Sequence, residues 1–316
     1  MRDKSNKDFP AGERVRKTGR ALLLGARVSA VLLALDPMCV RAAPAPPVPA
    51  LSGVWAHFTW PDAEPPETGP GPIVNLSLRD GASDPYQLAG DYRNPILRPN
   101  AAQIVKRFGE ESLAGKTYAT PSNQCWPGGV PFVFIANIGM QMIQQRDAIT
   151  ILYTNDHEVR HVRLGGRHPK RIVPSWYGDS IARYDGDTLV IDTVGVKIGP
   201  YAMLDLYGTP HSPSLHVVER YRLLDNETAK RVQERNLRGL SRLGRDPGLA
   251  ADPGDTGPGL QLDFTIEDEN VFTRAWSGTI SYRRPLGAWP EMACADNPID
   301  YIARGVKPPT AAKPDF

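Results

Sequence analysis

Residues 149–166 of the chain read ITILYTNDHEVRHVRLGG, and this stretch predicts the fold. It contains two runs, 149–154 and 157–164, in which apolar, β-branched and aromatic residues alternate with polar ones over the length of a typical strand. The dipeptides Asn155-Asp156 and Gly165-Gly166 follow these runs, and such dipeptides favour tight turns. We therefore expect the two runs to form a β-hairpin.

The second run also contains His157-Glu158-Val159-Arg160-His161, which matches the H-E-x-x-H signature of zinc proteases. In that signature the two histidines lie one helical turn apart and bind one zinc ion. In a strand the same two positions are about 13 Å apart, because each residue advances the chain by about 3.3 Å. The hairpin pattern therefore argues against a metal site, and a zinc-dependent hydrolase that uses His157 and His161 is the weaker alternative.

Similar short runs separated by turn residues continue along the chain, at 140–144, 180–184, 188–194, 215–223, 260–266 and 279–283. The 29 glycines and 31 prolines also favour many turns over long helices. We expect an all-β fold with a few accessory helices, in which an antiparallel meander closes into a barrel or a sandwich. A lipocalin-like barrel is one form of this fold. One such helix is expected after Pro99, capped by Asn100 and ending before Gly109.

The first 42 residues have the pattern of a secretory signal peptide. A basic segment that includes Arg14 and Arg20 precedes an apolar run, and Val40-Arg41-Ala42 fits a small-residue cleavage site. The apolar run is shorter than the ~20 residues that a membrane-spanning helix needs. We expect a periplasmic or secreted protein with no transmembrane segment after cleavage, an Ala/Pro-rich tether at 43–50, and a single β-rich domain at 51–316.

Charge and cysteine content support the same assignment. The chain has 37 Lys+Arg against 35 Asp+Glu, a near balance that argues against a nucleic-acid partner. The first 43 residues hold nine of the basic and four of the acidic residues, so the remainder is slightly acidic. Of the cysteines outside the leader, Cys125 and Cys294 would lie in an oxidising compartment, where we expect a disulfide. Two separate buried thiols are the alternative.

The run 215–223 supplies the first candidate for chemistry. Its period of two places Glu219 in an apolar row with Val217 and Tyr221, on the face opposite His216. A carboxylate inside a sheet must be paired, hydrogen-bonded or neutral. Glu219 is therefore a candidate general base, and a structural ion pair with an arginine from a neighbouring strand is the competing interpretation.

Two turn-rich segments, 174–180 and 207–212, add polar candidates, because loops on a β scaffold often carry function. With Glu219, the candidate acid–base residues are His211, His216, Asp179 and Tyr177. Four aromatic residues would suit an aromatic or hydrophobic small molecule: Trp176, Tyr221, Trp276 and Trp126.

Several motifs together resemble those of a large group of uncharacterised secreted bacterial proteins. They are W-x-G-x-S at 176–180, G-D-T-L-V-x-D-T-x-G at 186–195, H-S-x-x-L-H-x-x-E-R at 211–220, and the segments around Cys125 and Cys294. The resemblance covers about residues 120–295 and implies an all-β fold without implying an activity. The chain departs from the group at about 226–259, where an arginine-rich helix and an Asp/Pro/Gly-rich loop are inserted. This insertion is either a solvated excursion, or a lid or oligomer contact.

Three functions fit these observations. The first is an exported, cofactor-independent acid–base enzyme, of lyase, isomerase, dehydratase or hydrolase type, with a hydrophobic substrate in a barrel pocket. The second is a non-catalytic periplasmic protein that binds a small molecule, and the third is the zinc hydrolase. The sequence contains no dinucleotide, Walker, C-x-x-C or haem motif, so no cofactor is expected, and a homo-oligomer is left open.

Overall fold

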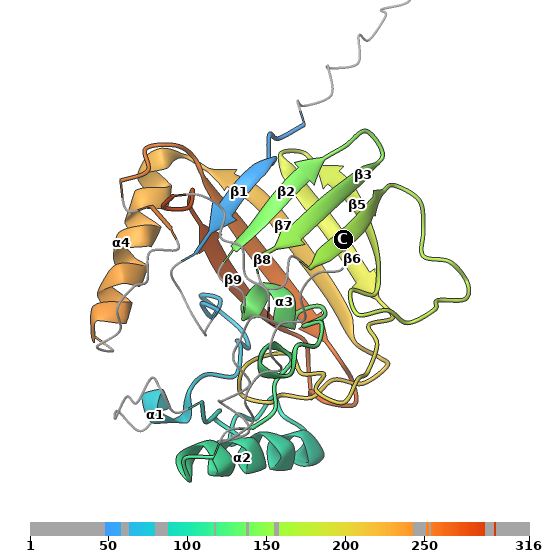
Figure 1. The fold of residues 1–316 in the computed structure, drawn as a ribbon, viewed down its shortest axis with the longest axis vertical. Helices are drawn as coiled ribbons and strands as arrows, with labels where there is room; N and C mark the ends of the chain where they lie inside the picture. Colours follow the sequence, from blue (N-terminus) through green and yellow to red (C-terminus); the bar gives the residue numbers. More distant parts are fainter. Residues whose placement is uncertain are drawn as a thin grey trace, which may run out of the picture. The chain divides into compact units, whose positions relative to one another are not determined.

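The computed structural model describes residues 48–57, 63–79, 88–116, 118–136, 139–154, 158–242, 251–252, 254–287 and 294 (Figure 1). The chain divides into two compact units, Met1–Pro44 and Ala45–Phe316, and all described residues belong to the second. The expected signal peptide and most of the tether therefore lie outside the described residues.

Nine strands form one sheet in sequence order, which confirms the all-β prediction. The strands are β1 (Gly53–Ala56), β2 (Gly139–Gln144), β3 (Ala148–Tyr153), β4 (Val159–Leu164), β5 (Asp179–Asp185), β6 (Thr188–Val194), β7 (His216–Leu224), β8 (Gly259–Glu267) and β9 (Trp276–Tyr282). The first and last strands meet where Ala56 and Arg283 exchange two backbone hydrogen bonds of 2.8 Å. The sheet thereby curls into a nearly closed barrel (Figure 1).

One pair of strands departs from the expected antiparallel meander. β4 and β5 are parallel, with Arg163 opposite Ile181 and Leu164 opposite Ala182, whereas every other neighbouring pair is antiparallel. A parallel pair needs a connection long enough to return the chain to the starting end of the sheet. Residues 165–178, which we call the β4–β5 crossover, provide that connection.

The expected alternation of side chains is present on the barrel strands. In β8 and β9 every second residue is buried, as the pleat of a strand with one face in the core requires. Large side chains fill this interior, among them Trp55, Tyr153, Phe264 and Trp276.

The helices are accessory, as expected. They are α1 (Leu76–Arg79), α2 (Pro99–Leu113), η1 (Ser122–Gln124), α3 (Phe132–Ile135) and α4 (Asn226–Arg242). The prediction for α2 was wrong at both ends. Pro99 takes the first helical position, so Arg98 and not Asn100 is the N-cap, and the helix continues through Gly109, where close packing on Ala89 leaves little room for a side chain.

The described part of the H-E-x-x-H segment, residues 158–161, lies in the expected hairpin. β3 and β4 pair antiparallel with Thr150 opposite His161, and the backbone N–H of Tyr153 donates to the carbonyl of Glu158. His157 lies outside the described residues. His161 is exposed on β4, so the strand prediction is confirmed for the described part of this motif.

The expected insertion contains a helix, α4, which packs beside β8 and β9 (Figure 1). Ala229 lies against Gly259, and the Gln233 side chain donates to the carbonyl of Asp252 over 3.0 Å. None of the helices in the described part of the chain combines the length and the apolar character that spanning a bilayer requires.

Candidate functional site

Glu219 is inside the barrel, and both of its carboxylate oxygens accept hydrogen bonds from one arginine. Arg160 Nη2 donates to Oε1 over 2.7 Å, and Arg160 Nη1 donates to Oε2 over 3.0 Å. Both side chains are 0% exposed. Because β5 and β6 separate β4 from β7 in the sheet, this ion pair crosses the barrel interior.

Hydroxyl groups complete the surroundings of this pair. Arg160 also donates to Ser180 Oγ and, over 2.7 Å, to Thr193 Oγ1, while the Tyr221 hydroxyl donates to Glu219 Oε2 over 2.8 Å. Burial opposes the charge on Arg160, but Glu219 outweighs this effect and raises the pKa of the guanidinium. Burial, together with the Glu219 charge, raises the pKa of Tyr221. Arg160 and Glu219 therefore form an ion pair whose hydrogen bonds are made to each other and to the hydroxyls of Ser180, Thr193 and Tyr221.

Asp179 is on the outside of the barrel, at the start of β5. Arg163 donates two hydrogen bonds to its carboxylate, over 2.8 and 2.9 Å, and His168 Nδ1 lies 2.6 Å from Oδ1. The hydrogen bonds from Arg163 lower the pKa of Asp179. His168 Nε2 lies 3.0 Å from Asp192 Oδ1, so this ring ties the β4–β5 crossover to both β5 and β6.

His216 is on the same outer surface. Its Nε2 lies 3.1 Å from Asp192 Oδ1, and its Nδ1 lies 3.5 Å from a Glu267 carboxylate oxygen. His216 and Glu219 project from opposite faces of β7, as the period of two predicted. Glu219 therefore contacts Arg160 inside the barrel, whereas His216 contacts Asp192 and Glu267 on its outside.

The two remaining acid–base candidates occupy separate surroundings. His211 is partly buried, which lowers its pKa, and its Nδ1 lies 3.4 Å from the carbonyl of Ser212. The Ser212 hydroxyl donates to Asp268 over 2.7 Å. Tyr177 lies beside Glu158, and burial followed by the Glu158 charge raises its pKa, so the phenol remains protonated.

Two of the predicted ligand-binding aromatics lie together at a surface. The indole rings of Trp126 and Trp176 meet edge to face with centroids 5.5 Å apart, and Tyr201 meets Trp126 with centroids 6.0 Å apart. Lys197 Nζ lies 4.9 Å from the Trp176 ring centroid. We call these four residues the basic aromatic face, together with the exposed residues that flank them in the crossover and in 195–200, which include Arg167, Lys170, Arg171, Val173 and Ile198.

Three chain segments converge at Trp176 to build this face. Ser175 pairs with Val196 in an isolated parallel bridge, and the N–H of Lys197 donates to the carbonyl of Ser175. The N–H of Val130 donates to the carbonyl of Trp176, and the ring of Trp176 leaves no room for a side chain at Gly199. The segments are thus fixed side by side by backbone contacts.

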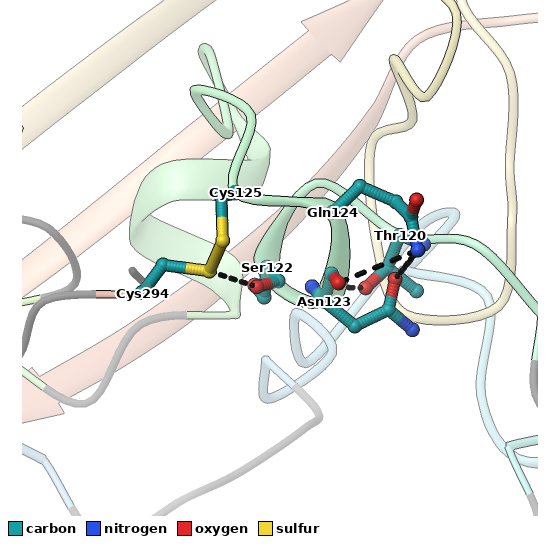
Figure 2. Close-up of a disulfide and its surroundings, with 6 residues drawn as sticks. All are labelled: Thr120, Ser122, Asn123, Gln124, Cys125 and Cys294. Atoms are coloured by element: carbon teal, nitrogen blue, oxygen red, sulfur yellow. Dashed lines mark hydrogen bonds between the residues drawn. A yellow bond between two sulfur atoms is a disulfide. The ribbon is translucent and has the colours of Figure 1, made fainter. Parts of the chain in front are cut away.

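Trp126 follows directly after the disulfide between Cys125 and Cys294, which confirms the expected pairing (Figure 2). Before it, Thr120 and Asn123 exchange side-chain-to-backbone hydrogen bonds of 2.8 and 3.2 Å around η1. Ser122 O lies 3.2 Å from the sulfur of Cys294 (Figure 2). The disulfide and this turn together position Trp126, which is 40% exposed.

The other two predicted aromatics are elsewhere. Tyr221 and Trp276 are buried in the barrel, Tyr221 beside Glu219 and Trp276 against Phe264 and Phe272. The structure therefore divides the candidates among the barrel interior, the outer surface and the basic aromatic face.

Sequence reasoning missed Arg160, Asp192, Tyr201 and Lys197. Arg160 could have been noticed because it shares the inward face of its strand with the apolar Val162. Among the described residues, no group of three or more His, Cys, Asp and Glu side chains could hold a metal ion. No family model, curated protein or solved structure matches the chain.

Proposed function

We propose that this chain is an exported, non-catalytic binding protein, and that the basic aromatic face binds an amphiphilic anion. The observation that carries the proposal is the surface cluster of Trp126, Trp176 and Tyr201 with the Lys197 ammonium over one ring. Aromatic rings offer an apolar contact surface, and the cation attracts a negative head group.

Local charge supports an anionic ligand. The segments 118–136, 165–178 and 195–204, which build the face, contain Arg167, Lys170, Arg171 and Lys197 but no Asp or Glu. The chain after its first 43 residues is slightly acidic, so these segments are more basic than the chain as a whole. One carboxylate that contacts these segments, Glu158, accepts a 2.8 Å hydrogen bond from the N–H of Gly128.

The acid–base enzyme receives less support from the geometry. Both oxygens of Glu219 are bonded to Arg160, and a general base must reach the proton that it removes. The described contacts of His211 and His216 also belong to groups separate from Glu219. A binding function does not require Glu219, His211 and His216 to lie in one site.

Isothermal titration calorimetry with dodecyl phosphate, kept below its micelle concentration, tests the proposal. We expect saturable binding that weakens about tenfold in Lys197→Gln and in Trp126→Ala, because each change removes one cation or aromatic contact. Arg231→Gln on α4 removes the same charge away from the face and should leave affinity unchanged. Absence of binding, or equal affinity in all variants, would overturn the proposal.

A further inference from the structure

The basic aromatic face also carries exposed aliphatic side chains, and from these we infer its partner. We propose that the face docks the protein onto the surface of an anionic lipid bilayer, with the tip of the β4–β5 crossover inserted among the head groups. This inference rests on the proposed function, since it names the source of the amphiphilic anion.

The aliphatic residues are unusually exposed for their type. Val173 is 79% exposed and Ile198 is 51% exposed. Val173 precedes Ser175 by two residues and Ile198 follows Lys197 by one, so both flank the backbone contact between Ser175 and Lys197. Exposed aliphatic side chains on paired loops gain free energy by entering hydrocarbon, which a water-borne phosphate or sugar does not offer.

The remaining residues match the layers of a membrane interface. Trp and Tyr prefer the head-group region, where Trp126, Trp176 and Tyr201 would lie once the aliphatic tips are inserted. Lys170 and Arg171 are exposed and directly precede Ile172 and Val173 in the crossover. Basic side chains next to an inserted apolar tip are attracted to anionic lipid head groups.

The acidic groups around the face are engaged in bonds to the protein. Glu158 is bonded to Gly128, and Asp179, at the end of the crossover, is bonded to Arg163 and His168. The crossover is held by the side chain of His168 and by the backbone of Ser175, so the six residues between them form a loop with fixed ends. Inserting a loop with fixed ends costs less conformational entropy than ordering a free segment.

Co-sedimentation with vesicles tests the inference, using protein recovered after export from the expressing bacterium. Phosphatidylglycerol/phosphatidylcholine vesicles should bind the protein, vesicles of phosphatidylcholine alone should not, and binding should weaken as salt is raised. Lys170→Gln/Arg171→Gln should reduce the partition coefficient about 30-fold. Val173→Ser/Ile198→Ser should reduce it by a similar factor through loss of apolar contact.

Matched controls separate this surface from general effects. Arg231→Gln/Arg238→Gln removes two positive charges from α4, and Val159→Ser removes an exposed valine from β4; neither should change binding. Equal sedimentation of the loop variants and these controls, or equal binding to uncharged vesicles, would overturn the inference. If dodecyl phosphate binds at the face while anionic vesicles do not, the bilayer is excluded and the binding function stands. If neither binds, both proposals fail.

Discussion

Arg160 and Glu219 form a fully buried ion pair in the barrel interior. A buried ion pair costs desolvation energy on both sides, and its geometry and additional hydrogen bonds decide whether that cost is offset. Here the pair is bidentate and is surrounded by the hydroxyls of Ser180, Thr193 and Tyr221. Removing one partner therefore leaves an uncompensated charge or donor in the core.

This pair yields a prediction for stability. Arg160→Met and Glu219→Leu should each lower the free energy of unfolding by about 3–5 kcal/mol, whereas the double variant Arg160→Met/Glu219→Leu should recover part of the loss. Urea unfolding followed by circular dichroism measures both effects. Arg220→Met, which changes an exposed arginine on β7, is the control and should alter stability only slightly. Additive losses in the double variant would contradict the prediction.

At the residue scale the sequence predicted orientation but not partners. The alternation around Glu219 correctly placed this side chain on the buried face of its strand. The identity of its arginine depends on how β4 and β7 face each other across the barrel, which no local pattern encodes. The sequence left an ion pair open for Glu219, and the pair is present, but its arginine lies on β4, which β5 and β6 separate from β7, and not on a neighbouring strand.

The β4–β5 crossover is the element on which the binding proposals depend. Partial burial opposes the charge on His168, but hydrogen bonds to Asp179 and Asp192 outweigh this effect and raise the pKa of His168 above its usual 6.5. Stabilisation by this ring is therefore complete below the unfolded pKa of 6.5 and is lost as pH rises through the folded pKa. The pKa of Asp179 is lowered, so its contribution is present above 3.8 and is lost as pH falls through the folded pKa.

These two shifts predict that the crossover is held most firmly between about pH 4 and 6.5. Amide hydrogen exchange of residues 166–178, corrected for intrinsic rates, should show protection that declines above this window. His168→Ala should remove the decline, and His161→Ala on β4 serves as the comparison. Protection in the wild-type protein that is independent of pH from 5 to 8 would refute the role of His168.

At the element scale the sequence predicted most strands, because alternation is a local property. The run 188–194 coincides with β6, and other strands differ from their predicted ranges by a few residues at one or both ends. β1 was not predicted as a strand, since its four residues are too few for a period of two to stand out. The parallel pairing of β4 and β5 also escaped prediction, because strand direction depends on where the crossover returns.

At the scale of the whole molecule, the disulfide joins residues that are 169 positions apart. Cross-linking so long a loop restricts the unfolded chain, and the entropic model gives about 5 kcal/mol. Cys125→Ser/Cys294→Ser should therefore lower stability by up to this amount and should also weaken dodecyl phosphate binding, because Trp126 follows Cys125. Thermal unfolding and calorimetry of the double variant check the two effects, and unchanged values for both would contradict them.

The expected leader gives a further prediction. If the chain is exported as proposed, protein recovered from the periplasm or medium should begin at Ala43, after the Val40-Arg41-Ala42 site. N-terminal sequencing identifies the first residue. Retention of Met1 in this protein would contradict cleavage at the site, and recovery of the protein from the cytoplasm alone would remove the export proposal and with it the expected compartment.

The crossover and the disulfide together have a consequence for limited proteolysis. The crossover divides the barrel into β1–β4 and β5–β9, and the Cys125–Cys294 bond connects the two halves. Trypsin acting after the exposed Lys170 or Arg171 would cut the polypeptide between these halves without severing their covalent link. Such a nicked protein would migrate as one species on a non-reducing gel and as two fragments after reduction, and it could stay folded as a two-chain barrel.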